Sequence, residues 1–149
     1  MAATYRPIAE TDIDIAVAMM REFYAIDHYP IDTEQSKKLF KQFIADENLG
    51  KSWLIESDGK PIGYVILTFV FNFEYGGRIA FVDELYLSEA ARGKGIGTQT
   101  MAFIRSESEK LSLKLLYLEV EDHNANAQKL YLSAGFSIHN RTIMKHKIN

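Results

Sequence analysis

Three glycines within five residues most strongly limit what this chain can fold into. They lie in Arg92-Gly93-Lys94-Gly95-Ile96-Gly97, although the whole 149-residue chain has only nine glycines. The preceding segment, Ile79–Leu87, is rich in β-branched and aromatic residues as strands are, and the following segment has helical periodicity up to about Leu111. Glycines between a strand and a helix let the backbone approach a ligand, and the free N–H groups of the first helical turn favour an anion. The segment therefore predicts an α/β fold with a phosphate site at a helix start.

Two common phosphate-binding motifs do not fit these glycines. A P-loop requires Ser or Thr after its lysine, but Lys94 is followed by Gly95. A dinucleotide fingerprint requires a third glycine, which would fall at Thr98 or Thr100. The loop therefore belongs to a different class of phosphate site.

The hydrophobic pattern predicts a single mixed α/β domain over residues 1–149. In chain order we expect a strand at Thr4–Ile8, a helix ending near Ile26, a helix after Asp32, strands at Ser52–Glu56, Ile62–Phe73 and Ile79–Leu87, a helix from Gly97 to about Leu111, a strand at Leu115–Val120, a helix at Asn124–Ala134, and last strands at Phe136–His139 and Thr142–His146. A strand–helix–strand unit crosses over right-handed with parallel strands, so an antiparallel meander should pass into one parallel pair. Helices should cover both faces.

Local signals support these boundaries. The first helix should bury one stripe, listed here in order: Ile15, Ala18, Met19, Phe23 and Ile26. Asp32 and Gln35 form a capping box for the second helix. An Asp-Gly pair at Asp58 predicts a tight hairpin, and Gly135 is the expected C′ residue of the last helix.

The composition excludes several classes of protein. A formal net charge of −3 disfavours binding to a nucleic-acid backbone, and the absence of cysteine excludes disulfides, thiolate nucleophiles and zinc–thiolate sites. The four histidines have no zinc-ligand spacing, so we expect no metal. No apolar run reaches about 18 residues and the first residues lack a signal-peptide pattern, so we expect no membrane partner. A domain without cysteine suits a reducing cytoplasm, so we expect a cytoplasmic location.

The glycine loop matches the pattern Arg/Gln-x-x-Gly-x-Gly/Ala, and here the chain resembles the GNAT superfamily of acetyl-CoA-dependent N-acetyltransferases. The likeness extends to the preceding strand, Val82–Leu87, and to Leu118-Glu119-Val120. It continues through the helix that follows, at Asn124, Ala127, Tyr131 and Gly135-Phe136. The resemblance implies a GNAT-like domain with a central sheet of about six or seven strands and about four helices, in which a splayed parallel strand pair holds CoA.

The resemblance also implies a set of residues that bind acetyl-CoA as cosubstrate. The main chain of the strand end would pair with the pantetheine arm, and the loop amides would bind the pyrophosphate. Asn124 would reach the pantetheine or the acetyl group, and Tyr131 would point its hydroxyl at the CoA sulfur. In this sequence the set is Leu85, Tyr86, Leu87, Arg92, Gly93, Lys94, Gly95, Ile96, Gly97, Thr98, Asn124 and Tyr131.

Acetyl transfer to an amine needs a proton acceptor and a proton donor. The resemblance implies that Tyr131 protonates the leaving thiolate as general acid. For the general base, Glu84 and Glu119 stand equal, with Asp83 behind them. Asp83 and Glu84 are neighbours on one strand, so they should point to opposite faces.

The sequence gives less information about the substrate that accepts the acetyl group. In this superfamily the first two helices and the loop between them, here Asp27–Asp32 near Tyr24, shape the acceptor site. We expect a primary amine on a small molecule or a peptide. Two alternatives stay open, a protein N-terminal acetyltransferase and a non-catalytic acyl-CoA-binding module, and homodimers are common in such families.

Overall fold

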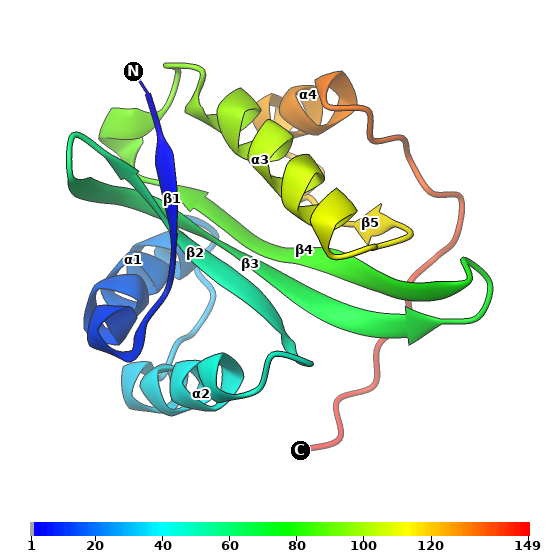
Figure 1. Cartoon of the computed structure of the whole chain (residues 1–149), viewed down its shortest axis with the longest axis horizontal. Coiled ribbons are helices and arrows are strands. Elements are labelled where there is room, and N and C mark those ends of the chain that lie inside the picture. The colour runs from blue at the N-terminus through cyan, green and yellow to red at the C-terminus, as the bar shows by residue number, and fades with distance from the viewer. Residues whose placement is uncertain (1) are drawn as a thin grey trace. The chain divides into compact units, whose positions relative to one another are not determined.

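A long antiparallel meander forms the centre of this computed structural model, which describes residues 2–149 (Figure 1). The elements in chain order are β1 (Thr4–Pro7), η1 (Glu10–Asp12), α1 (Ile13–Ile26), α2 (Thr33–Ala45), β2 (Gly50–Ser57), β3 (Lys60–Asn72), β4 (Gly77–Leu87), η2 (Glu89–Ala91), α3 (Ile96–Lys110), β5 (Leu116–Tyr117) and α4 (Ala125–Ser133). The chain divides into two compact units, Met1–Glu119 and Val120–Asn149.

The sheet of the first unit has the strand order β1-β2-β3-β4-β5. Its first four strands are antiparallel, and β5 runs parallel to β4, as the strand–helix–strand pattern predicts. The hairpin between β2 and β3 turns at Asp58 and Gly59, whose φ angles of 52° and 72° suit a two-residue turn. The predicted Asp-Gly hairpin is therefore confirmed.

The ladder between β3 and β4 contains a bulge beside the end of β4. Ile66 lies opposite Glu84, whereas Leu67 lies opposite Val82, so Asp83 is an extra residue in β4. A bulge changes which backbone groups and side chains face each side of a strand. After Asp83, odd-numbered residues therefore face the side of the strand that even-numbered residues face before it.

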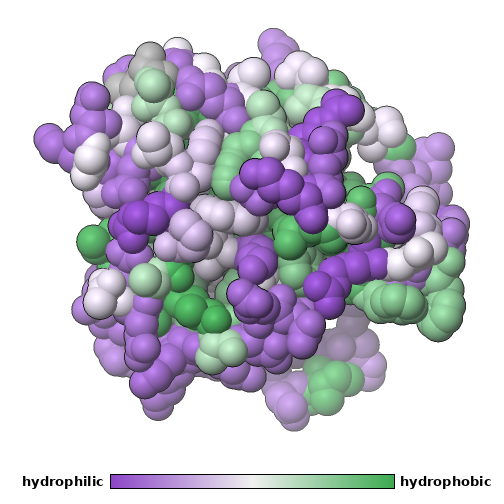
Figure 2. All heavy atoms as spheres, in the orientation of Figure 1, coloured by the Kyte–Doolittle hydropathy of each residue, from purple (hydrophilic) through white to green (hydrophobic). Residues whose placement is uncertain are grey.

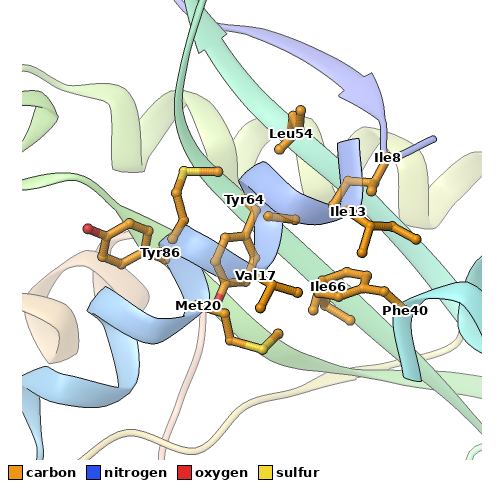
Figure 3. Close-up of a cluster of buried hydrophobic side chains, with 11 residues drawn as sticks. Ile8, Ile13, Val17, Met20, Phe40, Leu54, Tyr64, Ile66 and Tyr86 are labelled. Atoms are coloured by element: carbon orange, nitrogen blue, oxygen red, sulfur yellow. The ribbon is translucent and has the colours of Figure 1, made fainter. Parts of the chain in front are cut away.

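Helices α1 and α2 cover one face of the sheet and enclose the larger core (Figure 3). The buried side of α1 is formed by Ile13, Ala16, Val17, Met19 and Met20. The predicted stripe was partly wrong, because Ile15 and Ile26 are 44% and 52% exposed and Ala18 is exposed. The chain has apolar residues on more than one side of this helix, and the sheet selects the side that continues to Phe23. Hydrophilic side chains predominate on the surface around α2, whereas the exposed side of α1 also carries apolar side chains (Figure 2).

The opposite face of the sheet carries α3. Ile96 at the start of this helix is 1% exposed and packs with Ile55 and Ala91, against which Leu85 and Leu87 also lie. Met101, Ile104 and Ser108 are buried along the helix, as the periodicity predicts.

Asp32 caps α2 by accepting a hydrogen bond from the Gln35 backbone N–H at 3.1 Å, which confirms the predicted cap.

The sheet has five strands, fewer than the six or seven expected. The strand predicted at Leu115–Val120 is reduced to Leu116–Tyr117, and the strands predicted at Phe136–His139 and Thr142–His146 are absent from the described residues. The sequence pattern indicates only that a segment prefers an extended backbone. To form a strand, its N–H and C=O groups must also pair with a neighbouring strand.

No helix among residues 2–149 is long and apolar enough to cross a membrane.

In the second unit α4 is the one helix. The Asn124 side chain caps its start, accepting a hydrogen bond from the Ala127 N–H at 3.1 Å. Its end is closed by Gly135 at a φ of 98°, with the Phe136 N–H donating to the Tyr131 carbonyl at 3.0 Å. This is the glycine C-cap that the sequence predicts.

Candidate active site

The glycine-rich loop leads directly into α3, as predicted. Gly93 and Gly95 have φ angles of 74° and 80°, in the left-handed region that side chains disfavour. A Cβ atom added at either glycine would meet no atom within 4 Å, so the space beside the loop is open. Gly95 is the N-cap of α3 and has no side chain to satisfy the N–H groups of the first turn. These amides are free to bind an anion at the positive end of the helix dipole.

The last residues of β4 direct some of their backbone N–H and C=O groups away from β3. A Cβ on Gly63 would lie 2.1 Å from the Tyr86 carbonyl oxygen, so this carbonyl points toward β3. Backbone groups of successive strand residues point to opposite edges, so those of Leu85 and Leu87 point away from β3. The Arg92 Nε atom accordingly donates to the Leu87 carbonyl at 2.9 Å. The pairing of β4 with β5 ends at Phe81, so these outward groups lie beyond the β5 ladder.

The bulge at Asp83 is what produces this direction. Before it, the Arg78 carbonyl and the Ala80 N–H face the β5 side, bonded to Lys114 and Leu115 at 2.9 and 3.1 Å. Those are even-numbered positions. After the extra residue, odd-numbered positions face that side, which places the main chain of Leu85 there as the resemblance to the acetyltransferases implies.

Glu84 is held between two elements on the α1 face of the sheet. The Tyr24 hydroxyl of α1 donates to Glu84 Oε2 at 2.7 Å, and the Tyr64 hydroxyl of β3 donates to Oε1 at 2.7 Å. Burial raises the pKa of the Glu84 carboxyl, and the two hydroxyls lower it without cancelling that rise. Burial and the neighbouring carboxylate raise the pKa of both tyrosines, so both remain protonated donors.

The other two candidate bases are placed differently. Asp83 and Glu119 are both more exposed than Glu84, although Asp83 is partly shielded from solvent. The pKa of Asp83 is raised by desolvation and by the negative charge of Glu119, so these carboxylates interact with each other. The negative charge of Asp83 also raises the pKa of the Glu84 carboxyl. Asp83 and Glu84 are expected to point to opposite faces only in a regular strand, and the bulge removes this regular alternation.

A second tyrosine–carboxylate pair lies beside the first. The Tyr86 hydroxyl donates to Glu22 Oε2 at 2.8 Å, and this interaction contributes to raising the Tyr86 pKa to about 12, although burial is the larger cause. The Tyr86 ring lies 5.9 Å from the Tyr64 ring and also 5.9 Å from the Arg92 guanidinium carbon. Tyr86, whose side chain belongs to the α1 face, thus adjoins both the loop and the Glu84 cluster.

The remaining predicted residues lie in the second unit. Asn124 uses its side-chain oxygen to cap α4, so its amide nitrogen is the group left for a ligand. Tyr131 packs its ring edge-on against Phe136 at 6.0 Å, and burial raises its pKa, which keeps the hydroxyl protonated at neutral pH.

Sequence reasoning missed Tyr64 and Glu22. Tyr64 is fully buried within the apolar run Ile62–Leu67, and a tyrosine in such a run needs a partner for its hydroxyl. That rule could have marked Tyr64 as a functional candidate. The bulge decides which β4 side chain meets the hydroxyl, and nothing in the sequence locates it.

Together, a mixed sheet, a glycine loop at a helix start and a half-buried carboxylate on the preceding strand are typical of an α/β enzyme with a site for an anionic group. The acetyltransferase (GNAT) family model matches residues 17–136, and the chain belongs to this family. It is therefore an acetyltransferase.

Relatives and solved structures agree with this assignment. An uncharacterized N-acetyltransferase in the pepI 3' region of Lactobacillus delbrueckii subsp. lactis is 26% identical over 142 residues, covering 87% of this chain and 82% of the relative. An integron cassette protein from the mobile metagenome of Cole Harbour Salt Marsh is 28% identical with a TM-score of 0.88, covering 97% of this chain and 90% of its own. A crystal structure of a predicted acetyltransferase from Clostridium acetobutylicum with acetyl-CoA has a TM-score of 0.81 at 17% identity, covering 97% and 96%.

Proposed function

We propose that this acetyltransferase transfers the acetyl group of acetyl-CoA directly to a primary amine of a small molecule, with Glu84 as general base and Tyr131 as general acid. The observation that carries the proposal is the Glu84 carboxylate, held by two hydroxyls at 2.7 Å beside the strand end that precedes the loop. A peptide amine is the alternative acceptor, and the experiment below separates the two.

The loop and strand end fit acetyl-CoA. The open space beside Gly93 and Gly95, with the free amides of the first α3 turn, suits a pyrophosphate. The outward main chain of Leu85 and Leu87 suits the paired amides of a pantetheine arm. When bound, acetyl-CoA supplies the activated thioester. A structural neighbour containing acetyl-CoA supports this choice of cosubstrate.

Glu84 addresses the protonation of the acceptor. A primary amine with a pKa of about 10.4 is an ammonium ion at pH 7, and deprotonating it costs roughly 4.6 kcal/mol. Burial raises the pKa of the Glu84 carboxyl, which makes the ionised carboxylate a stronger base than a solvent-exposed glutamate. Glu84 would accept the proton at a carboxylate oxygen, directly or through one water molecule.

Tyr131 addresses the leaving group. Its hydroxyl stays protonated at neutral pH because burial raises its pKa, so its Oη atom can donate a proton to the departing thiolate. Such a transfer is typically worth about 10²–10⁴ in rate. No nucleophilic cysteine is needed, and the chain has none.

The test is thiol release from acetyl-CoA across an amine panel of polyamines, aminoglycosides, amino acids and N-terminal peptides. We expect turnover with at least one small amine, and turnover with peptides alone would transfer the proposal to a protein acceptor. If acetyl-CoA binds but no amine raises thiol release above background, the proposed reaction is wrong.

The base is identified by pH–rate profiles of Glu84→Gln and Glu119→Gln. We expect Glu84→Gln to remove the acidic limb of kcat/KM and Glu119→Gln to retain it. Loss of the limb in Glu119→Gln alone would assign the base to Glu119 instead.

A further inference from the structure

The two tyrosines that meet Glu84 come from separate elements. Tyr24 belongs to the last turns of α1, and Tyr64 belongs to the middle of β3. Each hydroxyl occupies a different oxygen of one carboxylate, both at 2.7 Å. A carboxylate bonded at both oxygens from fixed elements cannot rotate without breaking a charge-assisted hydrogen bond. The acceptor-side helix thus contributes to the orientation of Glu84.

The tyrosines are themselves held firmly. Tyr64 is completely buried, in the core cluster that also contains Val17 and Met20 (Figure 3). Phe23 packs edge-on against both Tyr24 and Tyr64, with ring centroids 6.2 and 6.3 Å away. The hydroxyls therefore sit where the packing places them.

No cation offsets the Glu84 charge within the described part of the chain. The salt bridges there do not include Glu84. The groups that face it are Tyr24 from α1, Tyr64 from β3 and Asp83 from β4 itself, and Asp83 opposes its ionisation. The nearby Tyr86 hydroxyl is directed to Glu22 instead. The two tyrosine hydroxyls are thus the groups that favour the ionised carboxylate.

We propose that Tyr24 and Tyr64 are positioning residues that hold the Glu84 carboxylate in one orientation and set the pH at which it accepts a proton from the acceptor amine. This assignment rests on the proposed function, in which Glu84 is the base. Neither tyrosine needs to touch the acetyl group, and both act through Glu84. Loss of either hydroxyl should make the carboxylate more basic, because a hydrogen bond to the charged form favours that form.

The experiment measures the acidic limb of kcat/KM in Tyr24→Phe and Tyr64→Phe. We expect the midpoint of the limb to move to higher pH by about one unit for each hydroxyl removed, since hydrogen bonds to charged groups contribute on the order of a pH unit or two. We expect the rate at the high-pH plateau to change less than the rate on the limb. A fall in kcat/KM by the same factor at every pH would show a structural role and overturn the proposal.

The Glu84 pKa can also be measured without turnover. Carboxyl carbons of glutamate, labelled with ¹³C, are titrated by NMR, and the Glu84 signal is identified by its loss in Glu84→Gln. We expect an upward shift of this pKa in Tyr24→Phe. An unchanged pKa there would overturn the proposal even if activity fell.

Tyr5→Phe is the matched control. The Tyr5 hydroxyl is also partly buried and bonded, to Thr100 Oγ1 at 3.0 Å, but it meets no carboxylate. It should lose one hydroxyl at similar cost to folding and leave the limb in place. Tyr24→Phe keeps the test valid if Tyr64→Phe fails to fold, because Tyr24 is only half-buried.

The outcomes separate this proposal from the proposed function. Absence of turnover with every amine contradicts acetyl transfer itself. Turnover with an unmoved limb in Tyr24→Phe contradicts only the role of the tyrosines. A limb that depends on Glu119 removes the tyrosine proposal while leaving the acetyltransferase reaction intact.

Discussion

Gly95 is the residue where backbone conformation and ligand binding coincide. Its φ of 80° disfavours any side chain, and its Cβ direction is open. We expect Gly95→Val to abolish acetyl-CoA binding, measured by calorimetry, because the side chain would fill the space proposed for the pyrophosphate and strain the loop by roughly 1–3 kcal/mol.

Gly59→Val provides the control for this prediction. Gly59 has a similar φ of 72° and equally open surroundings, but it lies in the β2–β3 hairpin. It should carry the same backbone strain while binding acetyl-CoA normally. Normal binding by Gly95→Val would mean that the loop does not hold the pyrophosphate.

Tyr131 tests the acid half of the mechanism at a single oxygen atom. Tyr131→Phe keeps the ring that packs on Phe136 and removes only the hydroxyl. We expect kcat to fall by about 10²-fold or more while the Kd of acetyl-CoA stays within a factor of a few. Steady-state kinetics and calorimetry measure the two quantities. An unchanged kcat would remove Tyr131 from the chemistry.

Elements were predictable from the sequence where a local signal defines them. The Asp-Gly hairpin, the Asp32 cap, the glycine loop and the Gly135 C-cap all have local chemical causes, and all four form. The side of α1 that is buried, the length of β5 and the state of residues 136–146 depend on partners distant in sequence, and there the predictions were partly wrong. The Tyr64–Glu84 contact depends on a bulge and was missed for the same reason.

The β3–β4 pairing beside this contact leaves no room for a side chain at Gly63. An added Cβ would lie 2.1 Å from the Tyr86 carbonyl oxygen and 3.1 Å from Leu87 Cδ2, and a backbone carbonyl cannot move aside cheaply. We expect Gly63→Ala to destabilise the protein by at least about 1–3 kcal/mol in thermal or urea unfolding. Wild-type stability in this variant would show that the two strands separate there without cost.

At the scale of the whole molecule, two carboxylates make opposite contributions to stability. Asp12 receives hydrogen bonds from Arg6 at 2.8 and 3.1 Å and from the Ala9 N–H at 2.8 Å. The Arg6 bonds are the main reason that its pKa is lowered in the folded protein. Glu84 has a raised pKa, mainly because it is buried. One residue joins β1 to the start of α1, and the other serves the proposed chemistry.

The pH dependence of stability should therefore distinguish these two residues. The Asp12 contribution is present above its unfolded pKa of about 3.9 and disappears as pH falls through the lower folded value, so Asp12→Asn should be destabilised at neutral pH and approach wild type in acid. The Glu84 contribution is complete below its unfolded pKa of about 4.3 and is lost as pH rises through the higher folded value. The Tm of Glu84→Gln minus that of wild type should consequently increase from pH 4 to pH 8, about the range to scan by circular dichroism at constant ionic strength. The change of this Tm difference with pH is the informative quantity. The amide of the substituted glutamine also alters one tyrosine hydrogen bond, but by an amount that does not depend on pH. A difference that does not change with pH would mean that ionised Glu84 carries no folding cost, and that its burial does not raise the proton affinity on which its role as base depends.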